Sequence, residues 1–270
     1  MPAKRPRVKN LGELAGDVLV FGGPCSNLQA TRAVLDIAEQ RGIPAERRIC
    51  TGDAVAYCGD PVETLRTLQG HCELVAGNCE KQLIAGADDC ACGFEDGSVC
   101  AQMSVTWFRF ARKSLGAAEL SCMADCPDMI VFSAYGLRYA VIHGGATDIS
   151  RYLWPTSPQS DFASEVAAIT DQVGNIDAVV AGHCGVAFER HVAGVRWINP
   201  GAIGMPPNDG RRQTRYMVLT ERGARIERLD YDVDGAVAAM QSAGLVQGYD
   251  QALKTGIWPS QDILPMQMRR

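Results

Sequence analysis

The chain has 270 residues, of which 47% are hydrophobic and 21% are charged, and its formal net charge is -5. This length can bury one sizeable core, and we predict a single α/β domain over residues 1–270. The negative charge excludes a basic footprint for nucleic acid, and no apolar run approaches the length of a membrane span. The basic residues Lys4, Arg5, Arg7 and Lys9 predict a short solvated arm, and since no apolar segment follows them the protein is expected to be cytoplasmic.

Short apolar runs in the first third of the chain predict strands that alternate with helices. Strands are expected at 17–22, 48–51 and 74–76, and helices at 27–40 and 61–68. This β-α-β-α-β series predicts a central sheet covered by helices. In such folds the functional side chains lie just beyond the carboxyl ends of the strands.

The remainder of the chain is less regular. Residues 88–127 predict an irregular cysteine-rich insertion that ends in a helix with a loop, and that either covers a site as a lid or packs on the surface. Beyond the insertion we expect a strand at 138–143, a helix at 162–173 and a strand at 178–181. Short strands are then expected over 187–232, with a hairpin at 215–231. A helix at 233–243 and an irregular tail end the predicted series.

Polar motifs follow the predicted strands. They are Gly22-Gly23-Pro24-Cys25-Ser26-Asn27, Gly52-Asp53, Gly77-Asn78-Cys79-Glu80, His143-Gly144-Gly145 and Gly182-His183-Cys184-Gly185. In this order they resemble the metal-binding framework of the calcineurin-like metallophosphoesterases, and the best match is the small bacterial and archaeal phosphodiesterase-like branch. The resemblance implies two packed mixed β-sheets flanked by helices, in a four-layer α-β-β-α sandwich.

The resemblance implies one complete metal site, formed by Asp53, Asn78, His143 and His183. One carboxylate, one amide oxygen and two imidazoles suit Mn, Fe or Zn. Taken singly, an Asp or Asn after Gly is usually a turn residue, but four such positions in the family's order favour a ligand set.

The second metal site of the family is largely absent from this chain. Gly23, Cys25 and Gly185 stand where the family has an Asp, a His and a His. Cys25 is a candidate ligand as a thiolate, and otherwise a small packed residue in the turn. We therefore expect one bound ion and leave a second one open.

Three residues are candidates for contact with the substrate. Cys79 stands at the position of the family's acid, where a thiol is a poorer proton donor than imidazolium at neutral pH. Asn27 and Arg151 are candidate substrate-binding residues, and the alternative for Arg151 is an ordinary surface position.

The motifs predict hydrolysis of a phosphomonoester or phosphodiester by a metal-activated hydroxide, on a small phosphorylated substrate or nucleotide. One alternative is a non-catalytic descendant that binds phosphate or a nucleotide, or acts as a scaffold. Another is a thiol-based metal or redox sensor that uses Cys25 and the cysteines of residues 90–126. Their spacing fits no common zinc finger, so free thiols packed as small hydrophobes are expected for most of the eleven cysteines.

Overall fold

A computed structural model describes residues 6–270, and its strands form two mixed sheets. The six-stranded sheet has the order β1 (Val8–Glu13), β5 (Met129–Ala134), β6 (Leu137–Ile142), β7 (Ala178–Ala181), β9 (Val195–Asn199) and β8 (Phe188–Val192). The five-stranded sheet has the order β11 (Gly223–Leu229), β10 (Thr214–Thr220), β2 (Val18–Phe21), β3 (Arg48–Cys50) and β4 (Glu73–Leu74). Strands β2, β3 and β4 are parallel to one another, as are β6 and β7, so their carboxyl ends share one edge of each sheet.

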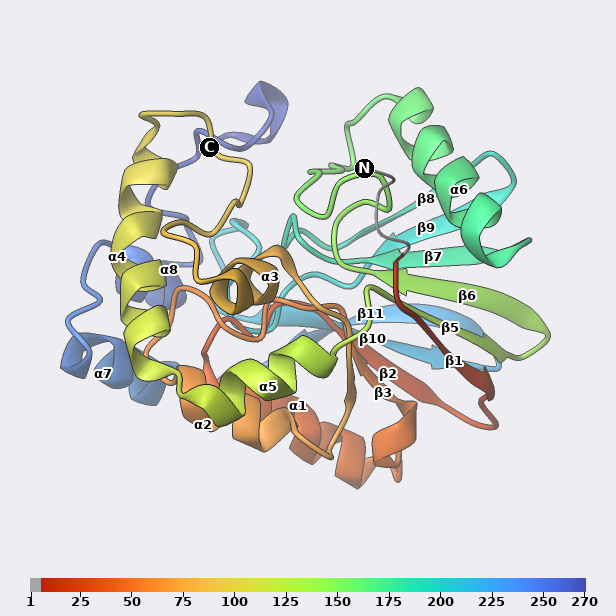
Figure 1. Ribbon diagram of the computed structural model, residues 1–270, viewed down its shortest axis with the longest axis horizontal. Coiled ribbons are helices and arrows are strands. Elements are labelled where there is room, and N and C mark those ends of the chain that lie inside the picture. The colour runs from red at the N-terminus through yellow and green to blue at the C-terminus, as the bar shows by residue number, and fades with distance from the viewer. Residues whose placement is uncertain (1–5) are drawn as a thin grey trace.

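Helices cover the outer face of each sheet. Helix α6 (Gln159–Val173) lies over the six-stranded sheet, and α1 (Leu28–Gln40) and α2 (Pro61–Leu68) lie on the opposite side of the molecule, against the five-stranded sheet (Figure 1). The remaining helices are α3 (Asn78–Ala85), α4 (Val99–Ser114), α5 (Ala117–Asp125), α7 (Val233–Ser242), α8 (Tyr249–Thr255) and the short 3-10 turns Ala45–Arg47 and Met266–Met268. Within the described chain, no helix is both long enough and apolar enough to cross a membrane.

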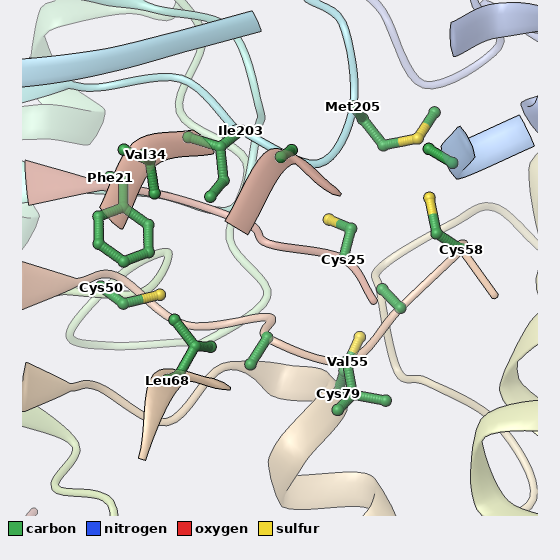
Figure 2. Packing of buried hydrophobic residues seen from close by; sticks show 14 of the residues in the cluster. Phe21, Cys25, Val34, Cys50, Val55, Cys58, Leu68, Cys79, Ile203 and Met205 are labelled. Carbon is green, nitrogen blue, oxygen red and sulfur yellow. The ribbon is translucent and has the colours of Figure 1, made fainter. Parts of the chain in front are cut away.

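The alternation of side chains along β2 shows how the layers are held together. Val18 and Val20 lie in the cluster between the two sheets, with Ile130 of the other sheet. Leu19 and Phe21 lie in the cluster beneath the helices, because successive strand residues point to opposite faces (Figure 2). A third cluster joins the six-stranded sheet to α6. The expected four-layer α-β-β-α arrangement is therefore confirmed, while the single domain stays a prediction.

The predicted N-terminal arm is wrong for the residues that the structure describes. Residues Val8–Glu13 form β1, which pairs in parallel with β5, and the Lys9 Nζ lies 2.5 Å from a carboxylate oxygen of Glu73. The sequence indicated only charge here, and not the neighbouring strand that supplies the hydrogen bonds. Lys4 and Arg5 lie outside the described residues.

The insertion and the tail are more regular than predicted, although the helix expected at the end of the insertion is present. Residues 88–127 contain α4 and α5, and the tail contains α8. Helix α4 begins where the Ser98 hydroxyl accepts a hydrogen bond from the Ala101 N–H, and it buries Trp107 and Phe108 against the cluster beneath the helices. The buried residues of α4 are Cys100, Ser104, Trp107, Phe108 and Ala111, and this helical spacing was present in the sequence.

Candidate metal centre

The predicted ligands come from loops that follow four strands. Asp53 follows β3, Asn78 begins α3 after β4, His143 directly follows β6, and His183 follows β7. The two sets of parallel strands end at the same edge of the sandwich, so these loops meet. The structure therefore brings all four predicted ligands together.

Two glycines allow the loops to approach one another. Gly52 has φ +100, and a Cβ added there would lie 2.7 Å from His143 Nδ1. A Cβ added at Gly77 would overlap the Asp53 carboxylate. Each glycine directly precedes a ligand, so the Gly-Asp and Gly-Asn pairs are used for close backbone packing as well as for turning the chain.

The lone pairs of the four ligands converge on one point. His143 Nε2 lies 2.9 Å from Asn78 Oδ1, 3.1 Å from His183 Nδ1 and 3.3 Å from Asp53 Oδ2. His143 Nδ1 donates to the Thr51 carbonyl at 2.8 Å, and because a carbonyl only accepts, the proton of the neutral ring is on Nδ1. Nε2 of the neutral ring therefore faces other acceptors with no proton between them.

This arrangement fits a divalent cation. The donor atoms of Asp53, His143 and His183 all lie within 4.8 Å of one another, the one such group found among residues 6–270. The buried His183 Nε2 has no hydrogen-bond partner, so hydrogen bonding does not satisfy this ring completely. A cation satisfies converging lone pairs that a single proton cannot, and the backbone carbonyl behind His143 supplies the orienting contact that metal-bound imidazoles usually have.

The charges of the cluster favour the forms that bind a metal. Burial raises the pKa of Asp53, but the charge and hydrogen bond of His143, with smaller contributions from His183 and the Cys79 N–H, together leave it lowered, so Asp53 is ionised. Burial lowers the pKa of His143, yet the Asp53 carboxylate leaves it raised above the ordinary value. Burial and then the His143 charge lower the pKa of His183 to about 3, so this ring is neutral. The cluster thus attracts one positive charge, held as a proton on His143 when no cation competes.

A buried glutamate that the sequence analysis did not single out holds the Asp53 loop. Glu80 is fully buried, and its carboxylate accepts the N–H groups of Asp53 at 2.9 Å, Gly77 at 2.7 Å and Val55 at 3.2 Å. Burial and the neighbouring Asp53 raise the pKa of Glu80 to about 7. Its place three residues after Gly77, at the start of α3, is a helix-capping signal that the sequence offered.

A second buried glutamate holds the loop after His143. Glu165 of α6 accepts the N–H groups of Ala146 at 2.6 Å and Thr147 at 2.9 Å. It also accepts the Arg151 guanidinium at 2.6 Å, and Arg151 lies 3.3 Å from Asp161 as well. The structure therefore places the predicted substrate-binding Arg151 in an ion-pair network outside the cavity lining.

Asn27 and Cys79 are likewise kept from the cavity by local structure. The Asn27 Oδ1 accepts the Ala30 N–H at 3.0 Å as the cap of α1, and its Nδ2 donates to the Gly204 carbonyl at 3.0 Å. Cys79 packs in the cluster beneath the helices, where burial and then Asp53 raise the pKa of its thiol well above the usual value (Figure 2). Neither side chain lines the cavity over the metal ligands.

Most cysteines are packed side chains. Cys25 lines the cavity, but it does not join the group of converging donor atoms, and burial raises the pKa of its thiol well above the usual value. Figure 2 shows it packed near Cys58 and Met205 in the same cluster. Cys90 and Cys92 are joined by a disulfide, so the expectation of free thiols is wrong for this pair. A buried, protonated thiol reacts slowly, which argues against a sensor built on Cys25.

The cavity over the metal ligands has a volume of about 80 Å³. It contains Gly23, Cys25 and Gly185, the positions where the family's second site departs, next to Asp53. The insertion contributes Cys92, Phe94 and Cys100 to its walls, and the last part of the chain contributes Tyr249, Trp258, Ser260 and Ile263. Of the two roles predicted for the insertion, the structure supports covering the site.

Comparison with known proteins identifies the class. The calcineurin-like phosphoesterase superfamily domain matches residues 26–223, and the chain belongs to this family. A metallophosphoesterase from Sphaerobacter thermophilus has a similar fold, with a TM-score of 0.69 and 20% identity over 90% of this chain and 100% of that one. Protein PH1004 of Pyrococcus horikoshii OT3 superposes with a TM-score of 0.73 at 16% identity, over 90% and 99% of the two chains. Comparison with curated proteins finds no match.

Proposed function

We propose that this protein is a metal-dependent phosphoesterase with one divalent ion, Mn, Fe or Zn, held by Asp53, Asn78, His143 and His183. The observation that carries the proposal is the convergence of Asn78 Oδ1, His183 Nδ1 and Asp53 Oδ2 on His143 Nε2. Membership of the phosphoesterase family gives the reaction class. The substrate is a small phosphorylated compound, and a cytoplasmic location stays a prediction.

A divalent ion bound at this centre acidifies a water molecule and neutralises phosphoryl oxygens. The protein's own part is to hold the ligands in place. The Thr51 carbonyl fixes the tautomer of His143, and Glu80 fixes the backbone on both sides of Asp53. The covering segments keep bulk water away from the ligands, which strengthens electrostatic interactions inside the cavity.

The test is metal analysis of protein purified without chelators, followed by phosphoesterase assays with added Mn, Fe or Zn. We expect close to one ion per chain, and loss of both the ion and the activity in His143→Ala. His191→Ala is the matched control, because His191 is an exposed histidine of β8 that does not line the cavity. Absence of an ion together with absence of metal-stimulated activity would reject the proposal.

A non-catalytic role is the second candidate. Gly23 and Gly185 line the cavity where the family has side-chain ligands, so a two-metal site lacks its usual donors here. Such a protein would be stabilised by inorganic phosphate in the presence of metal without turnover. Metal-dependent hydrolysis that disappears in His143→Ala separates the two candidates in favour of the enzyme.

A further inference from the structure

Two segments far apart in the sequence are joined over the metal ligands. The Val99 N–H donates to Asp262 Oδ2 at 3.2 Å, which links the start of α4 to the last part of the chain. Tyr57 packs against Trp107 of α4 and Tyr249 of α8, with ring centroids 4.8 Å apart in both cases. Figure 1 shows α4 and α8 together on the side of the molecule away from β1 and α6.

The last part of the chain lies over the positions where the family has ligands for its second metal and this chain has none. A Cβ added at Gly185 would lie 3.9 Å from Trp258 Cζ2, so this indole lies beside the position where the family has its last His. Two hydrogen bonds fix Trp258. Its indole Nε1–H donates to the Pro206 carbonyl at 2.6 Å, and its backbone N–H donates to Asn208 Oδ1 at 2.8 Å. Trp258 thus presents a fixed apolar surface to the cavity.

The wall that the two covering segments give this cavity is mainly apolar. It includes Phe94, Tyr249, Trp258 and Ile263, with Ser260 as a polar member. Within the described residues, neither Lys nor Arg is among those that line the cavity. A second phosphate group or any other anionic substituent would therefore meet no Lys or Arg of the wall, which makes burial of its charge costly.

The size of the cavity sets a second limit. A volume of about 80 Å³ corresponds to roughly five to eight water molecules. A phosphoryl group with a small substituent fits this space, whereas a nucleoside would extend beyond it. The residues that set this limit from the end of the chain lie beyond residues 26–223, the part that matches the family.

We propose that Phe94, Tyr249, Trp258 and Ile263 form a specificity-determining wall, which favours phosphate esters that carry a small uncharged apolar group over nucleotides. This inference rests on the proposed function for its reaction and on the cavity for its selectivity. In the hydrolysis, the oxygen of water forms the new bond to phosphorus and the bond to the leaving-group oxygen breaks. The leaving group takes the electron pair, and the proton of water goes to the leaving group or to solvent.

The test compares two diesters with the same leaving group, methyl p-nitrophenyl phosphate and thymidine 5′-(p-nitrophenyl phosphate), on metal-loaded protein. We expect the wild-type protein to favour the methyl ester by at least tenfold in kcat/KM. Trp258→Ala should reduce that preference at least tenfold, whereas Trp258→Phe, which keeps an aromatic wall, should leave it within about threefold. Ile263→Ala is a milder second variant that should shift the preference in the same direction if Trp258→Ala does not fold.

A binding measurement keeps the inference separate from turnover. Dimethyl phosphate should raise the melting temperature of the metal-loaded protein more than thymidine 5′-monophosphate does, and Trp258→Ala should remove this difference. Selective stabilisation without hydrolysis of either diester would overturn the proposed function and support the wall. Hydrolysis of both diesters with equal kcat/KM by the wild-type protein, or a preference unchanged in both variants, would overturn the wall and leave the proposed function standing.

Discussion

Replacement of Glu80 tests whether the metal centre depends on one buried carboxylate. Glu80 accepts three backbone N–H groups, from Asp53, Gly77 and Val55, and it is fully buried. Glu80→Ala leaves these three donors unpaired, and at about 1–3 kcal/mol for each buried unpaired group we expect a loss of roughly 3–9 kcal/mol in the free energy of unfolding. Glu80→Gln keeps one acceptor oxygen and should lose about 1–3 kcal/mol.

The assay is urea unfolding of the metal-free variants, with metal affinity measured separately by calorimetry. Because the loop that carries Asp53 loses its support, the metal Kd should rise by about 10–100-fold in Glu80→Ala. Glu119→Ala is the matched control, since Glu119 caps α5 in the same way by accepting the Gly116 N–H at 3.0 Å. It should cost about 1 kcal/mol and leave the metal Kd unchanged. A Glu80→Ala protein within 1 kcal/mol of the wild type, with unchanged metal affinity, would refute this reasoning.

Three further outcomes are expected. The metal Kd should depend on pH, because a proton on His143 competes with the ion. Measured by calorimetry between pH 5.5 and 8.5, the Kd should rise about tenfold for each pH unit below the raised pKa of His143 and level off above it. A Kd that does not change with pH would contradict this. Gly77→Ala should lower the free energy of unfolding, measured in urea, by about 1–3 kcal/mol and weaken metal binding, since its Cβ would overlap the Asp53 carboxylate. Gly70→Ala is the control for metal binding, which should stay unchanged because the space around Gly70 is open. Cys79→Ala should keep kcat within about threefold, and a hundredfold loss in a folded variant would restore Cys79 as the acid.

The convergence of the four candidate ligands was predictable because each of them directly follows a glycine or an apolar strand. A strand such as Ala178–Ala181 is visible in the sequence as an apolar run, and the parallel order of such strands brings their carboxyl ends together. The sequence alone therefore predicted a shared position at the edge of the sheets for Asp53, Asn78, His143 and His183. The four-layer fold followed from the resemblance that these motifs carry.

The residues misjudged from the sequence have their partners far along the chain. Asn27 stands in a motif, yet its side chain caps α1 and reaches Gly204, 177 residues away. Arg151 follows the His143 loop, yet it faces Glu165 of α6. A local pattern reports the periodicity of an element and the type of a residue, but the direction of a polar side chain depends on which donors and acceptors the packed fold leaves unpaired.

The sequence by itself determined the strands and helices that carry the motifs, and it predicted the four candidate metal ligands, because periodicity and short motifs are local properties. Only the tertiary structure decided what covers that metal centre. The wall that includes Phe94 and Trp258 forms where the insertion meets the end of the chain, through a contact between Val99 and Asp262 that spans 163 residues. Local periodicity does not predict such a contact, because the contact depends on two surfaces that exist only after the sheets and helices have packed.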